Sequence, residues 1–385
     1  MTTTKNNIPA GYKDSAVGII PQEWEVRQFK NCFTVGHGRD YKHLPNGNIP
    51  VYGSGGIICY VGSHLHDGET VCIGRKGTIN KPFYYNGSIW TVDTLFYTHS
   101  FRNILPRYVG YLFDNIDWMR YNEATGVPSL TAKTISNIKL AMPPMGEQRK
   151  IAEILGIWDE AIEKQNLLIE KLELRKRALM QRLLTGRIRL PGFIDDVQYK
   201  KLKPLIVEKS ERNTNQTYTN VLSVTNNRGF INQAEQFDRE VASDNTANYK
   251  LVHRGQFAYN PSRVNVGSLD LLQTYDLGIL SPMYIVFETR PTMDSKFLYY
   301  QLKSGWFVGH IPMYVQGSVR DSLSFDGLEN MKFWIPSLTE QKAIAEVLNT
   351  ADKEIAIHSK TLDALRLQKR GLMQQLLTGK TRVKI

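Results

Sequence analysis

The sequence predicts a mixed α/β protein in which two α+β lobes alternate with two long helices that pair as an antiparallel coiled coil. Three observations predict this fold. A stretch from the middle of the chain recurs near its end, both copies have the apolar spacing of pairing helices, and short apolar runs separated by turn residues fill the rest. The expected order is lobe 1–142, helix 143–192, lobe 193–335 and helix 336–385, related by an internal pseudo-two-fold repeat.

The repeat is visible without any gap. Residues 143–190 and 336–383 align at a constant offset of 193, with roughly twenty identities. The pairs Glu147-Gln148 and Glu340-Gln341 are identical, and LMQxLLTG is the densest match. Twice this offset nearly equals the chain length of 385 residues, so the duplication accounts for the entire chain.

Each predicted helix carries apolar residues at alternating steps of four and three, the 3.5-residue repeat of a helix pair. The first seam comprises Ile151, Leu155, Trp158, Ile162, Ile169, Leu172, Leu179 and Leu183. The second comprises Ile344, Leu348, Ala351, Ile355, Leu362, Leu365, Leu372 and Leu376. Polar residues interrupt both seams at equivalent positions, namely Gln165 and Lys176 in the first and His358 and Lys369 in the second. Such interruptions cost stability but fix the register.

The helix ends are marked by residues that start and stop helices. Prolines precede both helices, and Thr185-Gly186 and Thr378-Gly379 suit C-terminal stops. A helix of about 38 residues is roughly 55 Å long. The two helices can pair within one chain and act as a spacer between the lobes, or the coiled coil can serve only oligomerisation.

Both lobes are expected to be mixed α/β. In the first, residues 57–61, 70–73 and 89–92 predict strands, 53–56 and 74–77 predict turns, and Tyr108–Tyr121 predicts a helix. In the second, residues 257–259 and 283–287 predict strands, and Lys296–Leu302 predicts a helix. The offset of 193 also relates Ser129-Leu130 to Ser322-Leu323, inside the lobes.

One turn in each lobe combines basic or amide side chains with glycine. In Ile73–Thr78, two basic side chains sit on a glycine-flanked turn, where exposed backbone N–H groups are expected to approach a phosphate. Tyr259–Ser268 occupies the corresponding part of the second lobe and offers Arg263 and Asn265. Arginine suits guanine and asparagine suits adenine. Each turn can instead be a solvated basic loop.

The composition favours a polyanionic partner. The formal net charge is +11, and nucleic acid is the commonest partner of such a basic protein. The polar N-terminus lacks the apolar core of a signal peptide, and no apolar run approaches the roughly 18 residues that span a bilayer. Three cysteines with no CxxC spacing fit a reducing compartment, so a cytoplasmic location is expected.

Several enzyme classes are disfavoured by missing motifs, and no catalytic residue, metal site or cofactor is expected in this chain. GxxxxGK[ST] is absent, and Asn260–Arg263 lacks the second proline and the aromatic residue of the NPP-aromatic motif of amino-methyltransferases. Gly36-His37-Gly38 is a lone GxG. His64–Asp67 has the form HxHD, a weak metal candidate, and Cys59 and Cys72 suit buried strands better than nucleophiles.

These patterns resemble those of a known family. The stretches GIIPQEWEV, PVYGSGGI, IGRKGT and YNPSRVNVGS, the paired EQxxIAExL helix starts and the LLTG ends are similar to the DNA-specificity subunits of type I restriction-modification systems. The resemblance covers essentially the whole chain. It implies a dumbbell with two target-recognition domains, each reading half of a bipartite site in double-stranded DNA.

The resemblance also implies partners and sites. The helices are expected to set the gap between half-sites and to bind two methyltransferase subunits, which carry S-adenosylmethionine; motor-nuclease subunits complete the restriction complex. The DNA-facing residues implied are Arg75, Lys76, Thr78, Lys133, Arg263, Asn265 and Arg320. The alternatives are a coiled-coil scaffold whose lobes bind protein, and a DNA methyltransferase or nuclease that acts alone.

Overall fold

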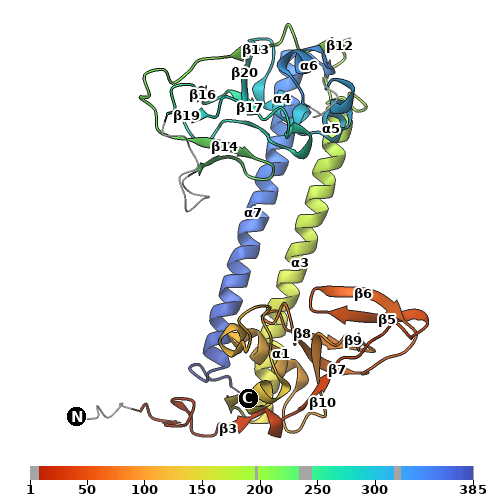
Figure 1. The fold of residues 1–385 in the computed structure, drawn as a ribbon, viewed down its shortest axis with the longest axis vertical. Helices are drawn as coiled ribbons and strands as arrows, with labels where there is room; N and C mark the ends of the chain where they lie inside the picture. Colours follow the sequence, from red (N-terminus) through yellow and green to blue (C-terminus); the bar gives the residue numbers. More distant parts are fainter. Residues whose placement is uncertain (1–7, 196–197, 234–244, 316–321, 385) are drawn as a thin grey trace. The chain divides into compact units, whose positions relative to one another are not determined.

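Contacts within the chain divide it into two compact units. The computed structural model describes residues 8–195, 198–233, 245–315 and 322–384, and Figure 1 labels its elements. Unit 1 comprises Met1–Asn166 and Lys360–Ile385, and unit 2 comprises Leu167–Ser359. The long helices α3 (Met145–Leu183) and α7 (Leu338–Leu376) each begin in one unit and end in the other. Each unit therefore contains the first part of one helix and the last part of the other.

The remaining elements fall entirely within one unit. Those of unit 1 are β1 (Tyr12–Lys13), β2 (Ile20–Pro21), β3 (Glu25–Gln28), β4 (Thr34–His37), β5 (Asn46–Gly53), β6 (Gly56–Val61), β7 (Glu69–Gly74), β8 (Phe83–Asn86), β9 (Trp90–Thr91), β10 (Leu95–His99), β11 (Lys139–Met142), α1 (Pro106–Asn115) and α2 (Ala132–Asn137). Those of unit 2 are β12 (Gln198–Lys201), β13 (Ile206–Lys209), β14 (Leu222–Thr225), β15 (Gly229–Asn232), β16 (Lys250–His253), β17 (Phe257–Tyr259), β18 (Leu269–Leu271), β19 (Leu277–Leu280), β20 (Ile285–Thr289), β21 (Lys332–Ile335), α4 (Ser295–Leu302), α5 (Gly305–His310) and α6 (Phe325–Asn330).

Both units contain a four-stranded antiparallel sheet with the same connectivity. The strand order is β4-β10-β7-β8 in unit 1 and β13-β20-β17-β18 in unit 2. Helix α1 packs on β7 and β8, and α4 packs on β18 (Figure 1). The strand that leads into each long helix pairs with an early strand of its unit, β11 with β3 and β21 with β12. The duplication therefore extends through both lobes, beyond the segments where sequence identity is evident.

Aromatic side chains fill the core of each unit. In unit 1 the largest fully buried side chains are Trp24, Phe29, Phe33, Phe96, Tyr108, Phe113 and Trp118; in unit 2 they are Phe257, Tyr259, Phe287, Phe297 and Phe307. Residues of both helices join these cores, Ile151 and Leu376 in unit 1 and Ile344 and Leu183 in unit 2. Each such burial stabilises the fold by about 1.5–3 kcal/mol. Neither lobe has a complete core without segments of both helices.

The structure keeps the predicted helix seams away from full solvent exposure. All sixteen seam positions named from the sequence are buried or half-buried. The helices run antiparallel within each unit, because partner numbers on α7 fall as positions on α3 rise: Asp159 pairs with Lys369 and Asn166 with Arg366 in unit 1.

The lysines that interrupt the seams are paired rather than merely tolerated. In unit 1, Lys369 bonds to Asp159, which also accepts a 2.6 Å hydrogen bond from the Tyr111 hydroxyl. In unit 2, Lys176 forms an ion pair with Asp352, which accepts a 2.7 Å hydrogen bond from Tyr300. Each ammonium also lies over the ring of that tyrosine, 5.2 Å and 5.7 Å from its centroid. These two clusters fix the register of the helix pair and tie it to α1 and α4.

A second pair of clusters joins the start of each long helix to the tail that follows the other. Glu147 is fully buried and accepts hydrogen bonds of 2.8 and 3.0 Å from Arg382 and one of 2.9 Å from the Trp24 indole. In unit 2 the buried Glu340 accepts two bonds of 2.6 Å from Arg189. The hydrogen bond to Glu147 raises the pKa of Arg382. Because an unpaired buried carboxylate is costly, each unit requires both segments.

The neighbouring glutamines anchor the lobes to the helices. Gln148 donates to the Pro143 carbonyl and accepts from the Leu105 N–H, which precedes α1. Gln341 makes the equivalent bonds in unit 2, to Pro336 and from Asp294 before α4. The EQ pair at each helix start therefore bonds to the lobe through Gln and to the far tail through Glu.

Both long helices are shorter than the ranges 143–192 and 336–385 expected for them. Within the lobes most local predictions are confirmed, and three need correction. The strands at 57–61, 70–73 and 257–259 and the helix at 296–302 are present. The helix predicted for 108–121 ends at Asn115, because the Trp118 indole binds the Phe113 carbonyl (2.8 Å) and residues 118–121 form a 3-10 turn. The strand predicted from 283 begins at Ile285, after a turn in which Tyr284 N–H bonds to Ser281. The strand predicted at 89–92 contracts to Trp90–Thr91. Among the described helices, none is long and apolar enough to cross a membrane.

Replacing Arg382 with Met should destabilise unit 1 selectively. The change leaves Glu147 buried without its cationic partner, which costs roughly 3 kcal/mol. Hydrogen–deuterium exchange should show lost protection in unit 1 peptides and unchanged protection in unit 2. Lys380→Met, two residues away at an exposed position, is the control. Equal loss in both units, or none, would contradict the role given to this ion pair.

Candidate nucleic-acid interface

The turn after β7 is held tightly in unit 1. It runs from Gly74 to Thr78, and a Cβ built on Gly74 would lie 2.2 Å from the Thr78 carbonyl oxygen. Gly77 adopts a φ of +87°, which favours glycine. Gly74 is therefore required because the backbone of Thr78 approaches it closely, and Gly77 is required by its backbone conformation.

The expectation that backbone N–H groups of this turn are exposed is wrong. The N–H groups of Arg75 and Lys76 donate to the Thr94 carbonyl, and that of Gly77 donates to Pro128. The Leu130 N–H in turn donates to the Arg75 carbonyl at 2.9 Å. Two segments distant in sequence thus pack behind the turn and accept the hydrogen bonds of these three N–H groups, so they are not free to meet a ligand.

The predicted residues of unit 1 differ in how free their side chains are. Lys76 and Lys133 are exposed, and among the described residues no hydrogen bond or ion pair involves either side chain. Arg75 is half-buried and its Nη1 lies 3.3 Å from the Asp93 carbonyl oxygen, whereas Thr78 is half-buried. Lys133 lies on α2, which begins two residues after Leu130. The segment around Leu130, which bonds to the turn, therefore leads directly into the helix that carries Lys133.

Unit 2 places an equivalent turn after β17, the counterpart of β7 in the sheet order. The Asn260 N–H donates to the Ser268 carbonyl at 3.0 Å, which closes the loop. Leu323, which matches Leu130 in the repeat, donates to the Pro261 carbonyl at 3.1 Å. Both units thus brace this turn with the same repeated leucine.

The predicted residues of unit 2 separate into three cases. Arg263 and Asn265 are both exposed, and Arg263 lines a cleft that Asn265 does not reach. Arg320 lies outside the described residues.

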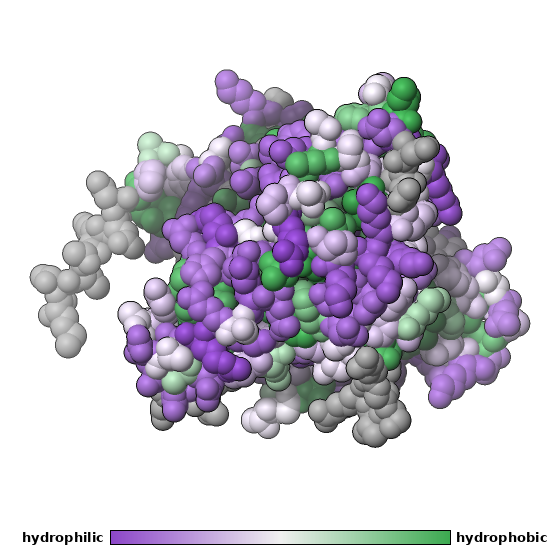
Figure 2. Space-filling view, turned by 90° about the horizontal axis from the view of Figure 1, so that it is seen from above, coloured by the Kyte–Doolittle hydropathy of each residue, from purple (hydrophilic) through white to green (hydrophobic). Residues whose placement is uncertain are grey.

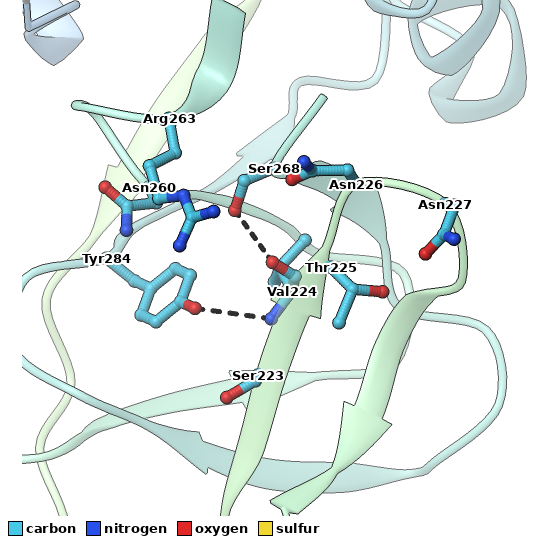
Figure 3. A pocket seen from close by; sticks show the side chains of 9 residues that line it. All are labelled: Ser223, Val224, Thr225, Asn226, Asn227, Asn260, Arg263, Ser268 and Tyr284. Atoms are coloured by element: carbon cyan, nitrogen blue, oxygen red, sulfur yellow. Dashed lines mark hydrogen bonds between the residues drawn. The ribbon is translucent and has the colours of Figure 1, made fainter. Parts of the chain in front are cut away.

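The cleft beside Arg263 has a volume of about 430 Å³ and a mostly polar lining. Figure 3 shows Ser223, Val224, Thr225, Asn226, Asn227, Asn260, Arg263, Ser268 and Tyr284 around it. The lining comes from the hairpin β14–β15, from the turn after β17 and from Tyr284, which directly precedes β20. Sequence reasoning missed the hairpin, although Asn-Asn-Arg-Gly between two alternating runs is a recognisable hairpin signal.

Half-buried charged side chains pack against this hairpin. The Phe230 N–H donates to Asp270 Oδ2 at 3.0 Å, and a Cβ on Gly229 would lie 1.9 Å from the same oxygen. Burial raises the pKa of Asp270, and nearby Lys303 opposes that shift. Burial likewise lowers the pKa of Lys303. This pair is therefore part of the scaffold of the cleft.

The weaker candidates from the sequence have ordinary structural surroundings. Asp67 accepts a 2.5 Å hydrogen bond from Ser88, and His66 Nε2 lies 3.2 Å from the Glu69 carbonyl oxygen. In the part of the chain that the structure describes, no three His, Cys, Asp or Glu residues are grouped to hold a metal ion. Cys72 is fully buried in β7, and burial raises the pKa of its thiol to about 12.

The surface drawn in Figure 2 is largely polar. Hydrophilic side chains cover most of this face, and hydrophobic ones appear in small separated areas. Scattered exposed apolar side chains are usual for a protein surface. The net charge of +11, which is that of the whole chain, favours a negatively charged partner.

Comparison with known proteins points to one family. The family described as "Type I restriction modification DNA specificity domain" matches residues 21–174 and 193–367. The MjaVIII specificity subunit of Methanocaldococcus jannaschii is 27% identical over 68% of this chain and 66% of its own length. The putative MjaX specificity subunit of the same organism is 25% identical over 97% of both chains.

Solved structures show the same fold. The type I restriction-modification S subunit from M. genitalium superposes with a TM-score of 0.60 at 14% identity, over 92% of this chain and 96% of that chain. A chain from a study of assembly and conformational transition in a type I R-M system gives a TM-score of 0.55 at 14% identity, over 94% and 99%.

Gly74→Ala should destabilise unit 1 far more than Gly55→Ala. The first places a methyl group against the Thr78 carbonyl, an overpacking that costs roughly 1–3 kcal/mol, whereas Gly55 has no atom within 4 Å of its Cβ position. Urea unfolding of the two variants measures the difference. Equal midpoints would show that the turn is loosely held.

Proposed function

This chain belongs to the family of type I restriction-modification DNA specificity subunits, and we propose that each of its units reads one half of a bipartite DNA site. Both units present a turn after the equivalent strand of the same sheet, braced by the same repeated leucine. The side chains on the two turns differ: Arg75 and Lys76 in one, Arg263 and Asn265 in the other. Two turns with equivalent backbones and different side chains are what the reading of two different half-sites requires.

The helix pair gives the proposed spacing and docking functions a physical basis. Two paired helices whose register is fixed by ion pairs can hold the half-sites at one separation. Leu174 and Leu367 occupy equivalent repeat positions and are 52% and 66% exposed. Large exposed apolar side chains at repeated positions suit two identical partners. We assign these partners as two methyltransferase subunits that carry S-adenosylmethionine, with motor-nuclease subunits completing the complex.

In this proposal the chain itself is non-catalytic. The nucleotide-binding and methyltransferase motifs weighed in the sequence are absent, and the family match is to specificity subunits. The comparisons favour this function over a coiled-coil scaffold and over an enzyme that acts alone.

Mapping methylated adenines genome-wide tests the function directly. Deleting the gene should remove one bipartite motif from the methylome. If every methylated motif persists, binding selection with the purified complex decides: equal affinity for all duplexes at moderate salt would refute sequence reading.

Alanine substitution should separate phosphate contacts from base contacts. Lys76→Ala should weaken binding to all sequences and reduce the slope of log affinity against log salt by about one. Arg263→Ala should relax the choice at one base pair, by about 1–3 kcal/mol of discrimination. Fluorescence anisotropy over several salt concentrations measures both, and Lys353→Ala on α7 is the control. Identical behaviour of the two variants would contradict these assignments.

Single substitutions on the helices should remove one methyltransferase copy each. Leu174→Glu and Leu367→Glu should each lower the number bound from two to one, because each alters one of two equivalent surfaces. Native mass spectrometry reports the stoichiometry. Leu167→Glu is the control, since the equivalent residue is Lys360 and identical partners cannot share an apolar contact there. Two copies bound to both variants would place docking elsewhere.

A further inference from the structure

We propose that the cleft of unit 2 reads purine bases, with Asn226 and Asn227 as base contacts beside Arg263. This inference rests on the proposed function and identifies residues that the sequence did not single out. The two asparagines form the tip of the β14–β15 hairpin, and Arg263 lies across the cleft from them (Figure 3).

The hairpin tip and the turn form one continuous surface. Gly267, at a φ of +102°, lies so close to the tip that an added Cβ would be 3.1 Å from the Asn226 carbonyl oxygen. The cleft between the two segments is open, and its volume lies in the range of roughly 300–1,000 Å³ that is typical of ligand sites.

Buried hydrogen bonds clamp the hairpin in place. The Ser268 hydroxyl donates to the Val224 carbonyl at 2.7 Å, and the Val224 N–H donates to the Tyr284 hydroxyl at 3.4 Å (Figure 3). At the tip, Thr225 Oγ1 accepts from the Arg228 N–H and donates to the Gly229 carbonyl, both at 3.1 Å. The backbone that carries the asparagines is therefore positioned before any ligand arrives.

The side chains proposed to contact bases have no hydrogen-bond partner among the described residues. Asn226, Asn227 and Arg263 are exposed, and within the described ranges no hydrogen bond or ion pair involves their side chains. Asn260, nine-tenths buried at the cleft wall, directs its Nδ2 only at the weak acceptor Met283 Sδ, 3.5 Å away. A hairpin held by these hydrogen bonds, with unpaired polar side chains at its tip, is suited to bind a polar ligand.

The chemistry of these groups matches purine edges. A carboxamide can donate to adenine N7 while accepting from N6, and a guanidinium can donate to guanine N7 and O6. Both pairings use N7, which only purines present in the major groove. The cleft thus favours a half-site in which adenine and guanine lie close together.

Unit 1 shows the same juxtaposition with different residues. There Gly77 lies against the tip of the β5–β6 hairpin, and its Cβ position is 3.3 Å from Ser54 Oγ. That tip, residues 53–56, has no amide or guanidinium. The arrangement of hairpin and turn is therefore retained while its chemistry changes, as expected if the hairpin tip helps determine which bases are read.

The test uses the full chain in complex with its methyltransferase and a duplex bearing the mapped site. Each purine of both half-sites is replaced in turn by its 7-deaza analogue, which lacks the N7 acceptor. In the wild-type complex, at least one adenine of one half-site should show about 3–10-fold weaker binding, the usual cost of one hydrogen bond. With Asn226→Ala or Asn227→Ala, that penalty should vanish while penalties in the other half-site persist. Asn215→Ala, an exposed asparagine outside the cleft, should keep every penalty.

The outcomes separate this inference from the proposed function. If the wild-type complex binds its site specifically but both asparagine variants retain every 7-deaza penalty, the assignment of these residues is wrong and the proposed function stands. If the wild-type complex shows no sequence dependence, the proposed function fails and this inference with it. The unchanged penalties in the other half-site show that the variants are folded.

Discussion

The structure depends on two buried carboxylates, each neutralised by an arginine from a distant part of the chain. Glu147 begins α3 but is paired with Arg382, which follows α7; Glu340 begins α7 but is paired with Arg189, which follows α3. Breaking such a buried pair costs free energy of unfolding, so each unit needs the tail that follows the other helix for its stability. The lysine–aspartate pairs then fix how far the antiparallel helices slide past one another. Because each repeat supplies one glutamate and one arginine of these pairs, the duplication and the stability of both units depend on the same interactions.

This arrangement allows the side chains of the two turns to differ without any effect on the fold. The four-stranded sheet, the bracing leucines and the EQ anchors recur in both units, so the equivalent turns are held in the same way. Because the backbone of each turn bonds to its own unit, the side chains on it can change without loss of structure. The two units can therefore differ in the side chains of their turns while they keep the same fold.

The sequence predicted the elements whose signals are local or repeated. The offset of 193 and the 3.5-residue spacing located both long helices, because these patterns need no tertiary knowledge. Lys176 and Lys369 were recognised only as interruptions, since their aspartate partners lie about 180–210 positions away and depend on the antiparallel register. The prediction of exposed N–H groups beside Arg75 was wrong, because these groups donate to the Thr94 and Pro128 carbonyls. Asn226 was missed because the hairpin and the turn come together only in the folded unit.

The hydrogen bonds beneath the hairpin matter because base reading yields little free energy. A good bidentate contact is worth about 1–3 kcal/mol, and fixing the backbone of a single residue costs about 1–2 kcal/mol. A loop that had to be ordered on binding would lose most of the affinity that one such contact supplies. Ser268, Tyr284 and Asp270 reduce this backbone cost in advance, since each forms a hydrogen bond with the hairpin backbone. Burying Asp270 is unfavourable by itself, as its raised pKa indicates, and a rigid hairpin is the gain that offsets it.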